Sequence, residues 1–142
     1  MPGGALVSAE LSFAIMRGGH VDATVLGALE VDNEGSLANW MIPQVRVPGM
    51  GGAMDIVTGA KKVYVATRHF DRSGRCKLVR KCSLPLTGYC AADVIVTEYC
   101  VVRNTYGHMA LTDIAEDVSI QELLDKTEMK LDVSAGLVRR RF

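Results

Sequence analysis

The sequence contains no segment typical of a membrane anchor or an export signal. No apolar stretch approaches the roughly 20 residues that a transmembrane helix needs. The opening residues 1–4 carry no basic charge in front of an apolar run, so we expect no secretory signal. The interpretation that follows is a cytoplasmic protein that does not associate with a membrane.

The patterns of a metal site and of a disulfide framework are also missing. The chain has four cysteines, none of which forms a C-x-x-C pair or has a histidine at ligand spacing: Cys76, Cys82, Cys90 and Cys100. Because nothing indicates export, we expect reduced, mostly buried thiols and no bound metal.

An excess of charge of one sign is absent as well. Sixteen basic residues balance sixteen acidic ones in 142 residues, which gives no net field toward nucleic acid or an anionic membrane. Arg139-Arg140-Arg141 is expected to be a solvated tail rather than an anion-binding patch. With 49% hydrophobic and 23% charged residues, the composition is that of one globular domain covering residues 1–142.

Helix and strand signals alternate along the chain and predict an α/β domain with a mixed sheet. Ser8 is a suitable N-cap for a helix over Ala9–Arg17, and Ser119-Ile120-Gln121-Glu122 has the form of a capping box that opens a helix carried by Ile120, Leu123 and Leu124. The predicted strands are Ala23–Val31 (buried on both faces), Lys62–His69, Lys77–Cys82, Asp93–Arg103 and His108–Ile114, with an extended segment at Leu37–Ile42 and turns at Asp32–Gly35, Arg72–Gly74 and Asn104–Gly107.

A glycine-rich loop is the most informative local pattern. Asn39-Trp40-Met41-Ile42-Pro43 is followed six residues later by Gly49-Met50-Gly51-Gly52-Ala53-Met54-Asp55, which leads into a short helix near Ala53–Thr58 that Gly59 ends. Such a loop offers unobstructed backbone N–H groups at a helix start, where developing negative charge can be held. The alternative is a tight strand-to-helix turn that binds no ligand.

Isolated polar residues give weaker signals. His20 and Asp22 could form an acid–base pair, but alternate residues of an extended segment point to opposite faces, so we expect a turn-supporting hydrogen bond there instead. Arg17 is expected to complete a helix end by binding carbonyls or a carboxylate. His69 and His108 have no evident partner in the sequence.

Seven stretches in chain order resemble one enzyme family. They are Ser12–Asp22, Leu26–Asp32, Leu37–Pro43, Gly49–Val57, Lys81–Thr87, Ala110–Ala115 and Lys126–Glu128. This ordered set resembles the β subunit of the short-chain CoA-transferases, of the acetate/acetoacetate and 3-oxoacid types. The resemblance implies a Rossmann-like mixed sheet of the CoA-transferase type, incomplete at its amino terminus because the chain begins roughly a third of the way into such a subunit.

The resemblance also implies a reaction. In this family a glutamate attacks an acyl-CoA thioester, and a glutamyl-CoA intermediate then passes CoA to a second, short-chain or 3-oxo carboxylic acid. Gly51, Gly52 and Ala53 match the loop beside the thioester, where they would hold the oxyanion, and Met54 would pack nearby. The implied partners are an α subunit within an oligomer and coenzyme A as substrate, with no covalently bound cofactor.

The nucleophile has no counterpart in this sequence. The family carries its attacking glutamate in a Ser-Glu-Asn-Gly motif, and no Glu-Asn-Gly occurs here. Asn33-Glu34-Gly35 is similar in composition, but it falls in a predicted exposed turn, where a solvated Glu34 would be a poor nucleophile. We therefore assign no catalytic residue to this chain.

Three interpretations remain open from the sequence. The first is the carboxyl-terminal portion of a CoA-transferase β subunit, inactive by itself. The second is a non-catalytic α/β module that binds CoA or a partner protein. The third is an assembly surface alone, with uncovered strand edges that favour self-association.

Overall fold

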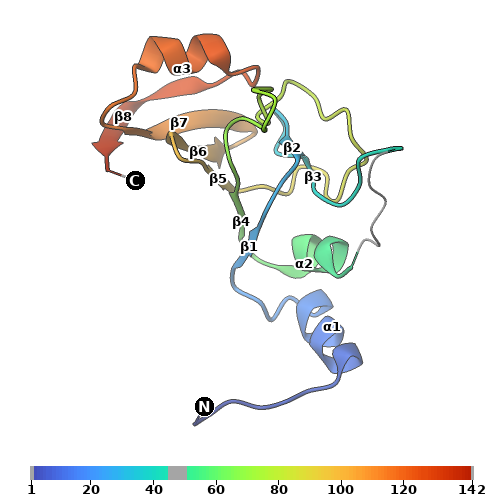
Figure 1. Cartoon of the computed structure of the whole chain (residues 1–142). Coiled ribbons are helices and arrows are strands. Elements are labelled where there is room, and N and C mark those ends of the chain that lie inside the picture. Colours follow the sequence, from blue (N-terminus) through green and yellow to red (C-terminus); the bar gives the residue numbers. More distant parts are fainter. Residues whose placement is uncertain (1, 45–50, 142) are drawn as a thin grey trace.

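A computed structural model describes residues 2–44 and 51–141 and shows a mixed α/β fold (Figure 1). Its helices are α1 (Ala9–Arg17), α2 (Ala53–Gly59) and α3 (Ile120–Lys126). Its strands are β1 (Thr24–Leu26), β2 (Glu30–Val31), β3 (Leu37–Ala38), β4 (Val63–Ala66), β5 (Val94–Val96), β6 (Cys100–Thr105), β7 (His108–Ala115) and β8 (Asp132–Arg140).

One six-stranded sheet organises the described part of the chain, in the order β1-β4-β5-β6-β7-β8. Strands β1, β4 and β5 are parallel, β6 is antiparallel to both of its neighbours, and β8 is parallel to β7. Strands β2 and β3 form a separate antiparallel pair. The predicted mixed sheet is confirmed, and its parallel half brings the carboxyl ends of β1, β4 and β5 to one edge, where α/β proteins commonly bind ligands.

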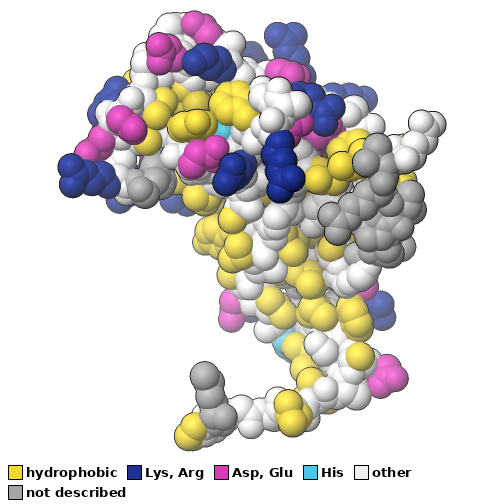
Figure 2. Space-filling model, in the orientation of Figure 1, with side chains coloured by type: hydrophobic (Ala, Val, Ile, Leu, Met, Phe, Trp, Pro, Cys, Tyr) yellow, Lys and Arg dark blue, Asp and Glu magenta, His cyan; other side chains and the backbone are white. Residues whose placement is uncertain are grey.

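The hydrophobic core lies on the sheet and under α3, not under α1. Val65 of β4, Ile95 of β5 and Leu111 of β7 are fully or almost fully buried, and Leu123 of α3 joins the same cluster. Helix α1 buries no residue. Figure 2 shows hydrophobic side chains at the surface in the lower half of the molecule, where Figure 1 places α1 and α2.

The predicted helices are confirmed within a residue or two. The Ser8 hydroxyl accepts a hydrogen bond from the Leu11 N–H at 3.3 Å and caps α1 as expected. Helix α3 begins directly after Ser119, but the Ser119 side chain makes no capping hydrogen bond, so the predicted capping box is not formed. The turn before β7 is confirmed at Tyr106 and Gly107, where φ is 53° and 86°, the left-handed pair that a two-residue hairpin requires.

The prediction of one buried strand over Ala23–Val31 is wrong. The segment contains two strands, β1 and β2, with Gly27–Leu29 between them. Strand β1 lies at the edge of the sheet, so its central residue Val25 is 69% exposed. The chain leaves the sheet at Ala28, whose carbonyl accepts hydrogen bonds from the Lys77 ammonium group and the Thr67 hydroxyl at 2.9 and 3.0 Å. The apolar composition of this segment could not reveal that the chain passes from the six-stranded sheet to the separate β2–β3 pair.

Two further strand predictions are wrong. Asp93–Arg103 is divided into β5 and β6, because the Thr97 hydroxyl accepts the N–H groups of Tyr99 and Cys100 and forms a turn. Lys77–Cys82 is not a strand; it makes an isolated bridge through Leu78 to Val31. The predicted strand Lys62–His69 shortens to β4, and the extended segment Leu37–Ile42 to β3.

The basic carboxyl end is not a solvated tail. Arg139 and Arg140 belong to β8, the strand that pairs with β7. The Arg140 guanidinium forms an ion pair with the buried carboxylate of Asp113, and Arg139 donates to the main-chain carbonyls of Glu116 and Val118 at 3.1 Å each. Two of the three arginines therefore fasten the last strand to the sheet although their side chains remain exposed, and Arg141 lies 3.4 Å from the Glu116 carboxylate.

Candidate functional site

The predicted glycine loop forms the start of α2. Gly51 has a φ of +55°, in the left-handed region, and Gly52 is the N-cap residue, with φ −87° and ψ 6°. Gly52 has no side chain that could cap this helix, and among the described residues no other side chain accepts from the backbone N–H groups of Ala53 and Met54 in its first turn. Gly49 and Met50, the first residues of the motif, lie outside the described residues.

Helix α1 holds this loop in place. A β-carbon at Gly52 would lie 2.7 Å from Cε1 of the Phe13 ring, closer than side-chain atoms can approach. The Arg17 guanidinium donates from Nε to the Asp55 carboxylate at 2.6 Å and lies 5.7 Å from the centroid of the Phe13 ring. That hydrogen bond lowers the pKa of Asp55. Arg17 thus binds a carboxylate, one of the two expected partners, and it joins the end of α1 to the start of α2.

Asn39 and Trp40 form hydrogen bonds to two other segments of the chain, at Gly27 and at Leu86–Thr87. The Asn39 side-chain amide donates to the Gly27 carbonyl at 3.1 Å, and its oxygen accepts from the Thr87 hydroxyl at 2.7 Å. The Trp40 indole N–H donates to the Leu86 carbonyl at 3.3 Å. These hydrogen bonds hold Asn39 and Trp40 in place ahead of the glycine loop. The Trp40 ring is partly buried, which indicates that it has a packing role.

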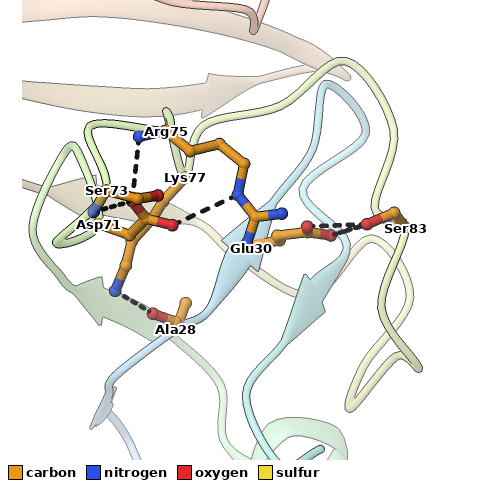
Figure 3. Close-up of polar contacts among 7 residues, drawn as sticks. All are labelled: Ala28, Glu30, Asp71, Ser73, Arg75, Lys77 and Ser83. Atoms are coloured by element: carbon orange, nitrogen blue, oxygen red, sulfur yellow. Dashed lines mark hydrogen bonds and ion pairs between the residues drawn. The ribbon is translucent and has the colours of Figure 1, made fainter. Parts of the chain in front are cut away.

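A buried carboxylate, Glu30, is a feature that the sequence did not reveal. Figure 3 shows its oxygens directed at Ser83, whose N–H and hydroxyl donate at 2.7 and 2.8 Å, and the Leu84 N–H adds a third bond at 3.1 Å. Glu30 is 4% exposed. The only hint in the sequence was that Glu30 is the one charged residue in the apolar run Ala23–Val31. Because three donors already engage the carboxylate, it fastens the β2 strand to the segment at Ser83 and is a poor candidate for a nucleophile.

His69 also acquires partners that the sequence did not reveal. The ring is fully buried, with Nε2 at 2.9 Å from the Thr127 hydroxyl and Nδ1 at 3.3 Å from the Thr97 hydroxyl. The Thr127 hydroxyl donates to the Leu123 carbonyl at 2.5 Å, so Nε2 carries the ring proton and donates it to Thr127. Burial lowers the pKa of His69 to about 4, so the ring is neutral at pH 7.

The other singled-out polar residues are exposed and separate from one another. Asp22 accepts from the Lys61 ammonium group at 2.6 Å, and not from His20. His108 lies 3.6 Å from the Asp132 carboxylate. Glu34 is exposed in the turn that follows β2, as the sequence predicted. Nothing brings these groups together as an acid–base pair within residues 2–44 and 51–141.

All four cysteines are free thiols: Cys76 and Cys100 are buried, Cys82 is half-buried and Cys90 is exposed. Burial raises the pKa of Cys82 to about 12 and that of Cys100 to about 11, which keeps both protonated and unreactive at neutral pH. No cluster of metal-binding side chains occurs among the described residues, and none of the helices described is long and apolar enough to cross a membrane.

Comparison with known proteins gives a consistent answer over nearly the whole chain. The family model described as coenzyme A transferase matches residues 1–126. The beta subunit of acetate CoA-transferase from Escherichia coli K12 is 47% identical over 141 residues, which are 99% of this chain and 65% of that protein. A succinyl-CoA:3-ketoacid coenzyme A transferase subunit from Helicobacter pylori 26695 is 43% identical over 133 residues, 94% of this chain and 64% of that protein.

Solved structures agree on the fold. The crystal structure of an acyl-CoA transferase apoenzyme from Escherichia coli O157:H7 superposes with a TM-score of 0.85 at 22% identity, over 96% of this chain and 31% of that one. The chain spans somewhat less than two thirds of the length of the two curated relatives, 65% and 64%.

Proposed function

This chain belongs to the coenzyme A transferase family, and we propose that within a complete assembly it is the part of a β-subunit domain, residues 1–142, that binds the acyl-CoA thioester. The single observation that carries the proposal is the ordered agreement with that family over residues 1–126, which includes the glycine loop. The relatives are named as subunits of acetate and succinyl-CoA:3-ketoacid CoA-transferases, which supports a partner in the form of an α subunit.

The proposed thioester site is the loop formed by Gly51, Gly52, Ala53 and Met54. Tetrahedral intermediates place negative charge on the thioester oxygen, and backbone N–H groups held in advance stabilise that charge. Gly52 supplies no side-chain cap to α2, which leaves such donors at the start of the helix. The half-buried Met54 side chain would contact the substrate arm beside them.

The nucleophilic carboxylate of the proposed reaction is supplied from outside residues 1–142. In the proposed reaction a glutamate oxygen attacks the thioester carbonyl and expels CoA thiolate, which leaves an acyl-glutamyl anhydride. The thiolate then attacks the glutamyl carbonyl, which releases the first acid and forms glutamyl-CoA, and the second acid takes over CoA by the reverse steps. Neither Glu30, which three donors engage, nor the exposed Glu34 is placed for this role.

The proposed substrates are short-chain or 3-oxo carboxylic acids of the acetate and acetoacetate type, with coenzyme A as the group transferred. The names of the two relatives support these acids. The same names support an oligomer that contains α and β subunits.

The test is CoA transfer by a completed enzyme. The chain would be fused to the part of the Escherichia coli beta subunit that it does not cover and co-expressed with the matching α subunit. We expect CoA to move from acetyl-CoA to acetoacetate. If a folded assembly transferred no CoA, the assignment would be wrong; if it still bound CoA in titration calorimetry, a non-catalytic binding module would be the better description.

A further inference from the structure

Half of the basic residues of this chain are concentrated in one segment. Residues 61–81 contain eight of the sixteen basic residues and one of the sixteen acidic residues, Asp71. Figure 2 shows Lys and Arg side chains gathered in the upper half of the molecule, in the region that contains the loops after β4 in Figure 1. The zero net charge of the chain therefore conceals a basic region that can attract anions.

A turn at Asp71 makes this basic segment rigid. One Asp71 oxygen accepts hydrogen bonds from the N–H of Ser73 at 2.8 Å, the hydroxyl of Ser73 at 2.7 Å and the N–H of Arg75 at 3.0 Å (Figure 3). Phe70 and Cys76 pair across the turn. The other Asp71 oxygen lies 3.3 Å from Nε of Arg75 and partly neutralises that guanidinium.

The same segment ends at a depression of about 530 Å³ that lies between the turn after β2 and the connection from α3 to β8. Its polar lining includes Asn33, Arg80, Thr127, Glu128 and Lys130. Arg80 and Lys130 are both exposed, and within the described ranges neither forms an ion pair with a carboxylate. Two cationic side chains that have no carboxylate partner among the described residues therefore line one concave surface.

Asn33 adds a neutral donor to these two cations. Its side-chain oxygen accepts the Lys130 N–H at 2.8 Å, which orients the side chain and leaves the amide NH₂ as a donor. The Arg80 guanidinium offers planar paired donors that match phosphate oxygens, and the Lys130 ammonium group adds a point charge. Glu128 is the carboxylate of the lining and opposes anion binding, which predicts modest affinity.

We propose that this depression binds a phosphate group through Arg80, Lys130 and Asn33. Its volume exceeds what inorganic phosphate needs and is within the range of pockets that hold small organic ligands. The phosphate can come from free phosphate or from a nucleotide such as the adenosine bisphosphate part of coenzyme A. The site is separate from the glycine loop and does not depend on the proposed thioester chemistry.

The test is an NMR titration of the whole chain with three probes: inorganic phosphate, adenosine 3′,5′-bisphosphate and phosphate-free pantetheine. Both phosphates or the bisphosphate alone should shift the amide signals of Asn33, Arg80 and Lys130, and pantetheine should not. Equal affinity for the two phosphates would identify free phosphate as the source, and preference for the bisphosphate would identify a nucleotide. Absence of shifts with both phosphates at millimolar concentration overturns the proposal.

Matched variants separate this site from the general basic field. Arg80→Gln should weaken bisphosphate binding about tenfold, the effect of losing one charge-assisted hydrogen bond, whereas Arg103→Gln removes the same charge from an exposed position on β6 and should leave the affinity unchanged. Glu128→Gln should tighten binding, because it removes the opposing carboxylate. Equal weakening by Arg80→Gln and Arg103→Gln would show that only the overall charge matters, and it would overturn the site.

Discussion

Gly59 of α2 lies directly against the main-chain carbonyl of Met16 in α1. A β-carbon at residue 59 would be 2.0 Å from that oxygen and 2.6 Å from the carbonyl carbon. The two helices can approach this closely only because residue 59 has no side chain, and this approach places Phe13 and Arg17 of α1 against the start of α2.

Gly59→Ala should therefore destabilise the chain. Alanine is favoured over glycine inside a helix by about 1 kcal/mol. Here, however, the new methyl group would collide with the main chain of Met16, which cannot move aside as a flexible side chain could, and such overpacking costs about 1–3 kcal/mol or more. We expect a net loss in the free energy of unfolding, measured with urea. Gly27→Ala is the matched control, because its β-carbon would meet only the Ala66 carbonyl, at 3.9 Å; equal losses in both variants would contradict the contact.

Ala53→Pro tests the proposed oxyanion donors in a completed enzyme. The first residue of a helix tolerates proline, which removes one N–H with little effect on the helix. Loss of one oxyanion donor lowers kcat on the order of 10²–10³-fold. Ala53→Ser retains the N–H and should retain the rate. Unchanged transfer by a folded Ala53→Pro enzyme would remove residue 53 from the site.

Glu30→Gln should destabilise the fold by about 1–3 kcal/mol. A glutamine oxygen can still accept the N–H groups of Ser83 and Leu84, but these bonds lose the negative charge that strengthens them, and the amide NH₂ takes the place of the oxygen that accepts the Ser83 hydroxyl. Urea unfolding at pH 7 measures the loss. Glu34→Gln makes the same change at an exposed position and should alter stability by less than about 0.5 kcal/mol. A tolerated Glu30→Gln would mean that these hydrogen bonds contribute little.

His69 should make stability depend on pH in mildly acidic solution. Its pKa is about 4 in the folded chain and about 6.5 when unfolded, so between these values the unfolded state binds the extra proton. Stability therefore falls as pH decreases from about 6.5 to 4, by up to about 3 kcal/mol. Urea unfolding at a series of pH values measures the slope. His69→Gln should flatten it, whereas His20→Gln, at an exposed position, should not.

The edge strand β1 should promote self-association of the chain. Val25 is 69% exposed on a strand that, among the described strands, pairs only with β4, and Leu11 on nearby α1 is 49% exposed. Open strand edges with apolar residues favour pairing between chains. Sedimentation velocity should show oligomers, and Val25→Lys should reduce them. A monodisperse monomer before the substitution would contradict this expectation.

The sequence predicted several of the elements that local signals define. The Ser8 cap, the Gly51-Gly52 start of α2 and the Asn104–Gly107 turn depend on neighbouring residues, and all three are present. Contacts between distant residues were not predictable in this way. Glu30 finds its donors 53 and 54 residues later along the chain, and Arg140 joins the sheet because of Asp113, so neither appears as a local pattern.

The candidate site was predictable only in its loop. The order of motifs identified Gly51, Gly52, Ala53 and Met54, and their position at a helix start followed from the glycines. The support from Phe13 and Arg17 was not visible, because it depends on how α1 packs on α2.

The partners of His69 join parts of the chain that are widely separated. Thr97 follows β5, and Thr127 ends α3, 58 residues after the histidine. All three segments must be in place before the ring has both partners, so this one side chain is fully bonded only when the segment after β4, the turn after β5 and the end of α3 have packed together. Because the ring is also fully buried, its N–H should exchange with solvent only in openings that include the end of α3 and the core beneath it, and its protection should follow the stability of those elements.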